Sequence, residues 1–275
     1  MGGKSNLHRL FALQEQYLAR YESYLAHGVS AKLDLNDKEN PSATNQAWMR
    51  YSYFEAGADA LRIIVSVLIE GLRDVPQTIL DFPCGSGRVT RHLVPFFSQS
   101  RVFACDLYDY HVKFCVDEFG AEGIMSRENF DEVDFGQKFD LIFCGSLLTH
   151  LPEDLFQAAL RLLKRSLSED GLAIVTLHGR YSKYLQQNIW KYLPDRLFRI
   201  AEAAASQTGF GYVDYQSDDR AKFDQQARYG ISLSLPHWTL RHAEQDYATR
   251  VLGYTERDWD SHQDVLVIGK PPIND

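Results

Sequence analysis

The turn from Asp81 to Gly87, with the sequence DFPCGSG, has the residue types and spacing of a nucleotide-binding turn. It lies between a short β-rich run that ends at Asp81 and a helical segment that we expect to begin near Arg88. Glycine has no Cβ, so the backbone at Gly85 and Gly87 can come close to a ligand and can adopt a positive φ. A strand, a glycine turn and a helix in this order predict a nucleotide site at the carboxyl end of a parallel strand.

A second acidic strand end follows the turn. Asp106 closes the β-rich run from Arg101 to Asp106, and a carboxylate there can accept hydrogen bonds from both ribose hydroxyls of an adenosine. A dinucleotide fingerprint counted from Gly85 needs a third glycine at position 90, where the sequence has Thr90. NAD is therefore disfavoured. The alternative is a plain tight turn with a solvated or helix-capping Asp106.

These residues resemble the first motif of the class I methyltransferases that use S-adenosylmethionine (SAM), usually written Asp-x-Gly-x-Gly-x-Gly. Asp81, Gly85 and Gly87 match the motif, and Pro83 replaces its first glycine. The resemblance extends from about Tyr53 to the C-terminus. It implies SAM as the cofactor and S-adenosylhomocysteine (SAH) as the product.

The resemblance also implies which residues hold the cofactor. They lie in the glycine turn, after the second strand, where Asp106 binds the ribose, and after the fourth strand, beside the methionine part. These residues are Asp81, Pro83, Cys84, Gly85, Ser86, Gly87, Arg88, Asp106, Leu107, Gly145, Ser146 and Leu147. Together with the later segment Trp259 to Asp264, these residues are similar to those of a bacterial subset of small-molecule methyltransferases.

Methyl transfer from a sulfonium is an in-line displacement, so the protein must align the acceptor and exclude water. An alcohol acceptor must also lose a proton. His150 follows the fourth predicted strand and is the leading candidate for the catalytic base. The alternative is a histidine at a helix entry that bonds to the backbone just before Pro152.

Other candidates for substrate binding lie later in the chain. His178 ends the fifth predicted strand, and Arg180 and Tyr181 follow it. We interpret all three as residues that line the substrate pocket. The alternative for His178 is a plain residue at a strand end. The segment His262-Gln263-Asp264 opens the last strand, where His262 either reaches the substrate or stabilises a turn. Tyr229 belongs to a set of aromatic residues that form either a pocket wall or the core of a small subdomain: Phe210, Tyr212, Tyr215, Tyr229 and Trp238.

From Thr78 onward, β-rich runs alternate with helical segments, which indicates a parallel sheet with crossover helices. We predict an α/β, doubly wound, mainly parallel seven-stranded sheet of the Rossmann-like methyltransferase type, with a terminal antiparallel hairpin. The helix from Pro152 to Leu167 is the clearest crossover, and Gly171 ends that connection. The predicted strands are Thr78 to Phe82, Arg101 to Asp106, Gly123 to Ser126, Phe139 to Gly145, Gly171 to His178, Thr249 to Glu256 and Gln263 to Lys270.

The N-terminal part precedes this pattern. We predict an extension over residues 1–50, with a helix from Asn6 to His27 that stops at Gly28 and a polar linker from Lys32 to Gln46. The methyltransferase domain then spans 51–275, begins with a helix from Tyr53 to Arg73 and carries a substrate-recognition insertion at about 181–238. The apolar face of the first helix could cap the site or form a homodimer.

Composition excludes several partners. The 29 Lys and Arg residues against 37 Asp and Glu give a net charge of −8, and no basic stripe suits a nucleic acid. The apolar stretches are too short to cross a membrane, so we predict a cytoplasmic protein with no membrane partner. The cysteines form no CxxC pair, so we predict buried, reduced thiols and no metal site.

The sequence therefore predicts an enzyme that transfers a methyl group from SAM to an O or N atom of a small-molecule acceptor. A natural-product or saccharide intermediate is the acceptor class considered. Two alternatives are a SAM-binding protein without catalysis and an NAD-dependent oxidoreductase, against which Thr90 argues.

Overall fold

The computed structural model describes residues 2–37, 47–189, 191–215, 228–245 and 249–270. The chain divides into two compact units by its contacts. Unit 1 comprises residues 1–126 and 139–143, and unit 2 comprises residues 127–138 and 144–275. Part of the predicted linker, residues 38–46, lies outside the described residues.

The sheet has seven strands in the order β3-β2-β1-β4-β5-β9-β8, which confirms the predicted fold class. Within unit 1, β1 pairs in parallel with β2 and β4, and β2 pairs in parallel with β3. Within unit 2, β9 pairs antiparallel with both β5 and β8, so the predicted terminal hairpin is present. The strands are β1 Thr78–Asp81, β2 Arg101–Asp106, β3 Glu122–Met125, β4 Phe139–Cys144, β5 Leu167–Leu177, β8 Arg250–Trp259 and β9 Gln263–Gly269.

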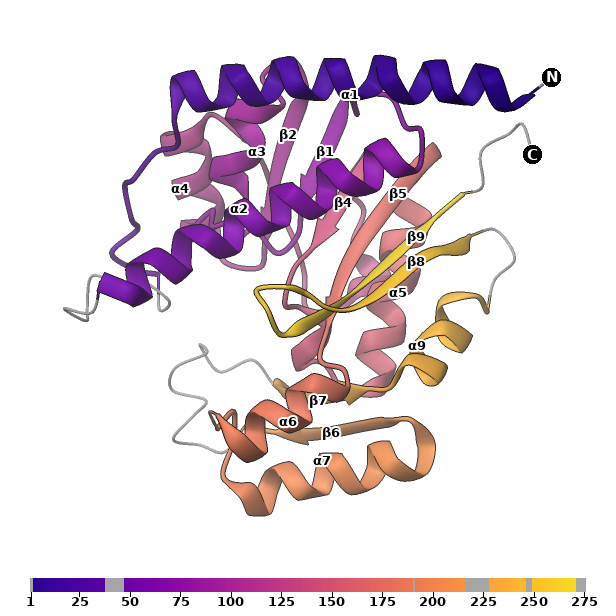
Figure 1. Ribbon diagram of the computed structural model, residues 1–275. Coiled ribbons are helices and arrows are strands. Elements are labelled where there is room, and N and C mark those ends of the chain that lie inside the picture. The colour runs from indigo at the N-terminus through magenta and orange to yellow at the C-terminus, as the bar shows by residue number, and fades with distance from the viewer. Residues whose placement is uncertain (1, 38–46, 190, 216–227, 246–248, 271–275) are drawn as a thin grey trace. The chain divides into compact units, whose positions relative to one another are not determined.

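The central strands of unit 1 are buried runs rather than alternating patterns. In β1 and β2, every residue after the first is buried, as expected when helices cover both faces of a parallel sheet. The helices of this unit are α1 Gly2–His27, α2 Ala47–Glu70, α3 Thr90–Phe96 and α4 Asp109–Phe119. In Figure 1, α3 and α4 lie beside β2, the strand whose end carries Asp106.

The first helix is part of unit 1 and packs on α2 and α3. Leu13 and Tyr17 are buried on its inner face, and the Tyr17 ring stacks on that of Phe96. Gly28 has a φ of +73° and donates its N–H to Tyr24 O, which confirms the predicted helix stop. An apolar outer face stays exposed, at Leu7, Phe11, Leu18, Tyr21 and Leu25. A homodimer through this face stays a prediction.

Unit 2 contains β5, β9 and β8 and the predicted crossover helix, α5 Glu153–Ser166. Leucines and alanines on one face of α5 are buried, and the acidic residues in its first turn and basic residues in its last turn complement the helix dipole. Short 3₁₀ turns lie at η2 Phe130–Glu132 and η3 Leu148–His150. η2 packs on α5, and η3 contacts β5.

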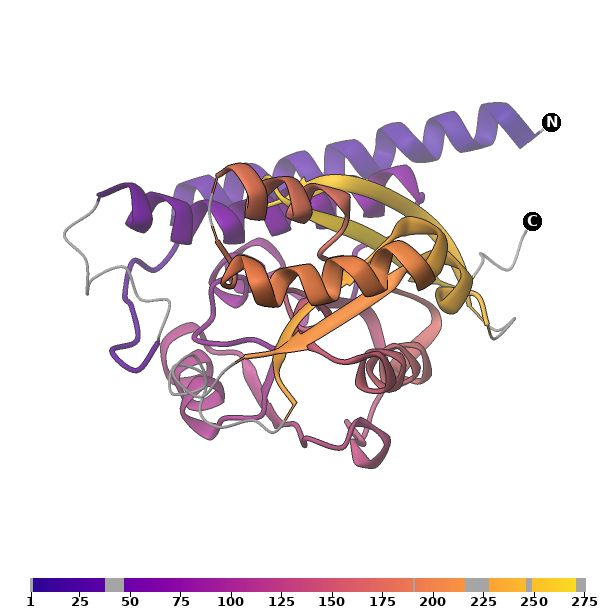
Figure 2. The ribbon, with the colours of Figure 1, turned by 90° about the horizontal axis from the view of Figure 1, so that it is seen from below.

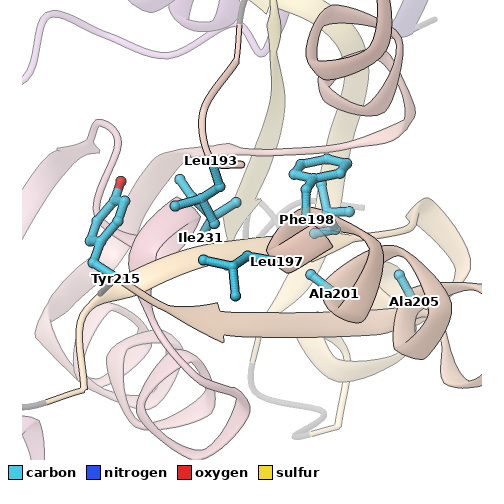
Figure 3. Close-up of a cluster of buried hydrophobic side chains, with 8 residues drawn as sticks. Leu193, Leu197, Phe198, Ala201, Ala205, Tyr215 and Ile231 are labelled. Atoms are coloured by element: carbon cyan, nitrogen blue, oxygen red, sulfur yellow. The ribbon is translucent and has the colours of Figure 1, made fainter. Parts of the chain in front are cut away.

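The predicted insertion contains a small sheet that the sequence did not reveal. Strands β6 Phe210–Asp214 and β7 Gly230–Ser234 pair antiparallel in a two-stranded sheet of their own. Helix α7 Asp195–Thr208 packs along it (Figure 2), and the cluster drawn in Figure 3 forms between them. That cluster consists of Leu193, Leu197, Phe198, Ala201, Ala205, Tyr215, Ile231 and Leu233. The insertion also contains α6 Arg180–Asn188 and α9 Pro236–Ala243.

Several predicted boundaries are corrected. The helix after the glycine turn begins at Thr90 rather than near Arg88. β5 begins at Leu167, directly after α5, so Gly171 lies inside the strand and does not end the connection. β8 runs from Arg250 to Trp259 rather than from Thr249 to Glu256, with a register shift after Thr255. No helix in the described ranges is long and apolar enough to cross a membrane.

Candidate functional site

The glycine turn of unit 1 is joined by backbone hydrogen bonds to the strands on both sides of β1. Phe82 N–H donates to Phe143 O of β4 at 2.9 Å, and Cys84 N–H donates to Cys105 O of β2 at 2.8 Å. The Phe82-Pro83 peptide bond is cis. The turn is thus fixed at the carboxyl end of the parallel strands, where the sequence placed it.

The two glycines of the turn are required for different reasons. Gly87 has a φ of +75°, and a Cβ there would lie 2.3 Å from the ring of Phe119 and 3.0 Å from Cys115 Sγ. Gly85 has a φ of +48°, but a Cβ there would meet no atom within 4 Å. Gly87 therefore lets α4 pack closely, whereas Gly85 needs only the left-handed backbone and lies beside open space.

Asp106 closes β2 and is joined to the turn. One carboxylate oxygen accepts the Gly85 N–H at 2.9 Å, and the other accepts the Tyr108 N–H at 3.1 Å; the side chain is buried. Burial raises the pKa of Asp106, and the charge of His111 and backbone N–H groups, including that of Leu107, oppose this shift. The two predicted elements of the cofactor site therefore lie together.

Asp81 is buried beneath the turn, and its carboxylate accepts a hydrogen bond from Thr90 Oγ1 at 2.6 Å. Burial raises the pKa of Asp81 to about 7, and the Thr90 hydrogen bond opposes this. Thr90 occupies the position where a dinucleotide fingerprint has its third glycine, and in the structure its hydroxyl bonds to Asp81.

Cys84 packs beside Cys115, and all four cysteines are buried and free, which confirms the predicted thiols.

Two residues at this site, Asp34 and His111, were not identified from sequence, and both contact Ser86. Ser86 Oγ lies 2.8 Å from Asp34 Oδ2 and 2.7 Å from His111 Nδ1. The Arg88 guanidinium lies 5.1 Å from the centre of the Tyr53 ring. Three buried carboxylates, those of Asp34, Asp81 and Asp106, thus surround or contact the turn. Acidic groups around the turn suit the sulfonium and ammonium groups of SAM better than the diphosphate of NAD.

Unit 2 contains the residues predicted to follow the fourth strand. Ser146 has a φ of +58°, its N–H donates to Thr176 Oγ1 at 2.8 Å, and its hydroxyl accepts from Gln263 Nε2 at 2.7 Å. Thr176 Oγ1 in turn donates to Gln263 Oε1 at 2.6 Å. The chain from Gly145 to Leu147 is therefore held in an uncommon backbone conformation by two neighbouring strands of unit 2, β5 and β9.

His150 is oriented by the insertion. Its Nδ1 donates to Gly230 O at 2.8 Å, its ring stacks on Tyr229 with the ring centres 4.7 Å apart, and the Tyr215 hydroxyl lies 3.3 Å from Nδ1. A proton on Nδ1 leaves the lone pair on Nε2. Burial lowers the pKa of His150 to about 4, opposed by the Gly230 hydrogen bond, so the ring is neutral near pH 7.

His178 lies at the centre of a group of rings. Its ring centre is 6.1 Å from that of His150, 6.2 Å from that of His262 and 4.8 Å from that of Tyr192. The side chain is buried, and its Nδ1 has no hydrogen-bond partner within the described residues. Burial and the two neighbouring histidines hold the pKa of His178 well below its usual range. We call His150, His178, His262, Tyr192, Tyr215 and Tyr229 the histidine cluster.

Two predicted substrate residues have partners elsewhere. Arg180 pairs with Glu256, and Tyr181 stacks beside Tyr184 and beneath the guanidinium of Arg257. Asp264 accepts hydrogen bonds from the Tyr254 hydroxyl and the Arg257 N–H, which is the turn-stabilising role. His262 Nδ1 bonds to Asp260 O, as the turn-stabilising role requires, and its ring centre lies 6.2 Å from that of His178; a contact of His262 with the substrate stays a prediction.

The aromatic set of the insertion is divided between core and cluster. Trp238 is buried and packs against Phe210 and Phe156, with ring centres 4.5 and 5.2 Å apart. Tyr215 and Tyr229 contact His150. Tyr215 also belongs to the buried hydrophobic cluster of the insertion, so the core interpretation holds for Phe210, Trp238 and Tyr215, and a pocket wall stays a prediction. Within the described ranges, no group of three His, Cys, Asp or Glu residues could hold a metal ion.

Residues 79–171 match the family model described as a methyltransferase domain. This segment contains β1 to β4, the glycine turn, Asp106, His150 and the first part of β5. No curated protein sequence matches the chain.

Solved structures share the fold. A SAM-dependent methyltransferase from Clostridium acetobutylicum has a TM-score of 0.53 at 15% identity, over 80% of this chain and 92% of that one. A protein from Pyrococcus horikoshii OT3 has a TM-score of 0.55 at 13% identity, over 88% and 100%. The 1,6-didemethyltoxoflavin-N1-methyltransferase of Burkholderia thailandensis has a TM-score of 0.50 at 14% identity, over 94% and 90%.

The glycine turn, the acidic end of β2 and the strand order together match the Rossmann-like methyltransferase fold. Residues 79–171 are a methyltransferase domain, and SAM is the methyl donor that such a domain implies. The residues around the turn fit such a cofactor, because the open space beside Gly85 and the buried carboxylates suit a cationic ligand with a ribose.

Proposed function

We propose that the enzyme methylates an O or N atom of a small-molecule acceptor, such as a natural-product or saccharide intermediate, and that the histidine cluster binds this acceptor. The observation that carries the proposal is the buried His178 Nδ1 without a partner. A buried polar atom left unsatisfied costs about 1–3 kcal/mol, so it is typical of a position that a ligand completes.

The rings around His178 define the chemistry of that ligand. Tyr229 stacks on His150, and Tyr192 lies against His178, so the cluster offers flat apolar faces with a few polar atoms. His150 and His178 are neutral near pH 7 because burial lowers the pKa of each. The cluster therefore suits a neutral acceptor with a planar or ring-shaped body and a hydroxyl or amine group.

We assign His150 as the base that removes the acceptor's proton. The Gly230 carbonyl accepts from Nδ1 and so keeps the lone pair on Nε2. Because the pKa of His150 lies at about 4, the ring stays able to accept a proton at every pH above that value. Turnover by a rate-limiting chemical step should therefore show no acidic limb near pH 6.5, where an exposed histidine would be protonated.

The test measures SAH formation with a panel of phenols, sugar alcohols and amines, and SAH affinity by calorimetry. His150→Gln should lower turnover about 100-fold and leave SAH affinity within about 2-fold. His178→Phe should raise the KM of the acceptor with the same unchanged SAH affinity. The control is His237→Gln, which changes an exposed histidine of α9 and should alter neither quantity. Full turnover by both His150→Gln and His178→Phe would contradict the proposed acceptor site.

A further inference from the structure

Residues 28–37, here called the strap, follow α1 and contact the glycine turn of unit 1. Asp34 is only 6% exposed, although Leu35 beside it is 91% exposed. Its Oδ2 accepts a hydrogen bond from Ser86 Oγ at 2.8 Å, and its Oδ1 accepts the Asn36 N–H at 2.9 Å. A buried carboxylate is costly unless it is hydrogen-bonded, so the strap directs its one buried charge onto the turn.

Arg91 joins the strap and the turn through their carbonyl groups. Its Nη1 donates to Ser30 O and Lys32 O, both at 3.0 Å, and its Nε donates to Gly87 O at 2.9 Å. The guanidinium is buried and lies over the ring of Tyr53 at 5.3 Å. A planar, rigid group with several donors fixes the relative positions of the backbone segments that it bonds.

The strap is also tied to two helices of unit 1. Ser30 Oγ donates to Glu118 of α4 at 2.7 Å, and Lys32 Nζ pairs with the same carboxylate. The Tyr53 hydroxyl of α2 donates to Asp37 at 2.7 Å. Contacts at both ends therefore hold Asp34 against Ser86.

Ser86 is the residue whose position most needs such support. Glycines flank it on both sides, and both have positive φ, so the chain here loses more conformational entropy on ordering than elsewhere. Its hydroxyl donates to Asp34, which leaves its oxygen to accept from His111 Nδ1. These two bonds fix the middle of the turn before a ligand arrives, and such preorganisation increases affinity.

We propose that the strap is part of the SAM site and that Asp34 is a positioning residue, which holds the glycine turn ready for the cofactor through Ser86. This inference rests on the SAM-dependent activity assigned above. It gives the N-terminal segment a function in cofactor affinity.

The first test compares Asp34→Ala with Leu35→Ala by SAH calorimetry and steady-state kinetics of the full chain. Asp34→Ala should weaken SAH binding about tenfold and raise the KM for SAM in parallel, with kcat within about 2-fold. Leu35→Ala shortens a side chain of the same strap that is 91% exposed, so SAH affinity should stay within about 2-fold. Asp34→Asn keeps an acceptor for Ser86 and should recover most of the affinity.

A double-mutant cycle gives the second test. Ser86→Ala removes the same bond from the other side, so the Asp34→Ala/Ser86→Ala protein should bind SAH no more weakly than the weaker single variant. Additive losses would overturn the proposal, as would an Asp34→Ala protein that melts at a lower temperature but keeps the SAH affinity and KM of the wild type. Failure of the wild type to bind SAH would overturn both the inference and the SAM assignment, whereas normal wild-type binding with unaffected variants would overturn the inference alone.

Discussion

The glycine turn of unit 1 and the histidine cluster of unit 2 are built in opposite ways. The turn is one contiguous segment, and its main features are backbone features: positive φ at Gly85 and Gly87 and hydrogen bonds to neighbouring strands. The cluster combines side chains from η3, the end of β5, the insertion and the start of β9. The difference shows why a cofactor site can be identified from a short motif and an acceptor site cannot.

The two regions also differ in how completely their polar atoms are paired. Asp34, Asp81 and Asp106 are buried carboxylates, and each accepts hydrogen bonds from the turn or from the helix after it. In the cluster, His178 Nδ1 has no partner within the described residues. We infer that the turn is ordered before SAM binds, whereas the cluster is completed by its ligand.

The largest predicted effect concerns the backbone of the turn. Gly87→Ala should lower the free energy of unfolding by about 3 kcal/mol, because a left-handed φ costs about 1–2 kcal/mol and overpacking against Phe119 costs about as much again. Gly85→Ala is the matched control and should cost about 1 kcal/mol, since its Cβ meets open space. Urea denaturation of both variants measures the difference. Equal losses would contradict the assigned role of Gly87 in packing.

An intermediate effect concerns the buried carboxyl beneath the turn. The pKa of Asp81 is raised from 3.8 to about 7, so between these values the folded state binds the proton and the unfolded state does not. Stability should therefore fall as pH rises through this window, by about 1 kcal/mol per pH unit. Asp81→Asn resembles the protonated carboxyl and removes this fall.

The measurement is the difference in the free energy of unfolding between Asp81→Asn and the wild type, from pH 4 to pH 8. The difference should be near zero at pH 4, and it should favour the variant increasingly up to about pH 7. A difference that does not change with pH would show that Asp81 has an ordinary pKa in the folded protein.

The smallest predicted effect tests which group orients His150 in the histidine cluster. Tyr215→Phe removes the hydroxyl that lies 3.3 Å from His150 Nδ1, but the stronger 2.8 Å bond to Gly230 O remains. The free energy of unfolding should fall by about 0.5–1 kcal/mol, and turnover should change less than about 3-fold. A loss of turnover as large as that of His150→Gln would mean that Tyr215, not the backbone, orients the base.

The central sheet could be predicted because each of its strands has a local signal. β2 has its predicted bounds, β1, β4 and β9 each end one residue earlier than predicted, and β3 is shifted by one residue toward the N-terminus. The start of β5 was missed because Ser168 to Asp170 is polar, and no local pattern shows that the strand begins before Gly171. The β6–β7 sheet was missed because its strands are far apart in sequence and no tight turn joins them.

The candidate site, like the sheet, could be predicted only where a local motif reports its residues. Asp106 and Gly85 were identified because motif spacing reports backbone geometry, and the structure shows that the Gly85 N–H donates to Asp106 Oδ2. Asp34 was not identified, because it lies in a polar segment, and the composition of that segment indicates only a linker. Its contact with Ser86 joins residues 52 positions apart, and no sequence periodicity reports such a contact.

The central claim is that the turn and Asp106 hold SAM, and calorimetry with SAH tests it most directly. The wild type should bind SAH, NADH should not compete, and Asp106→Ala should weaken SAH binding about 100-fold because the charge-assisted bonds to the ribose are lost. Unchanged SAH affinity in Asp106→Ala, or binding of NADH without binding of SAH, would contradict the account.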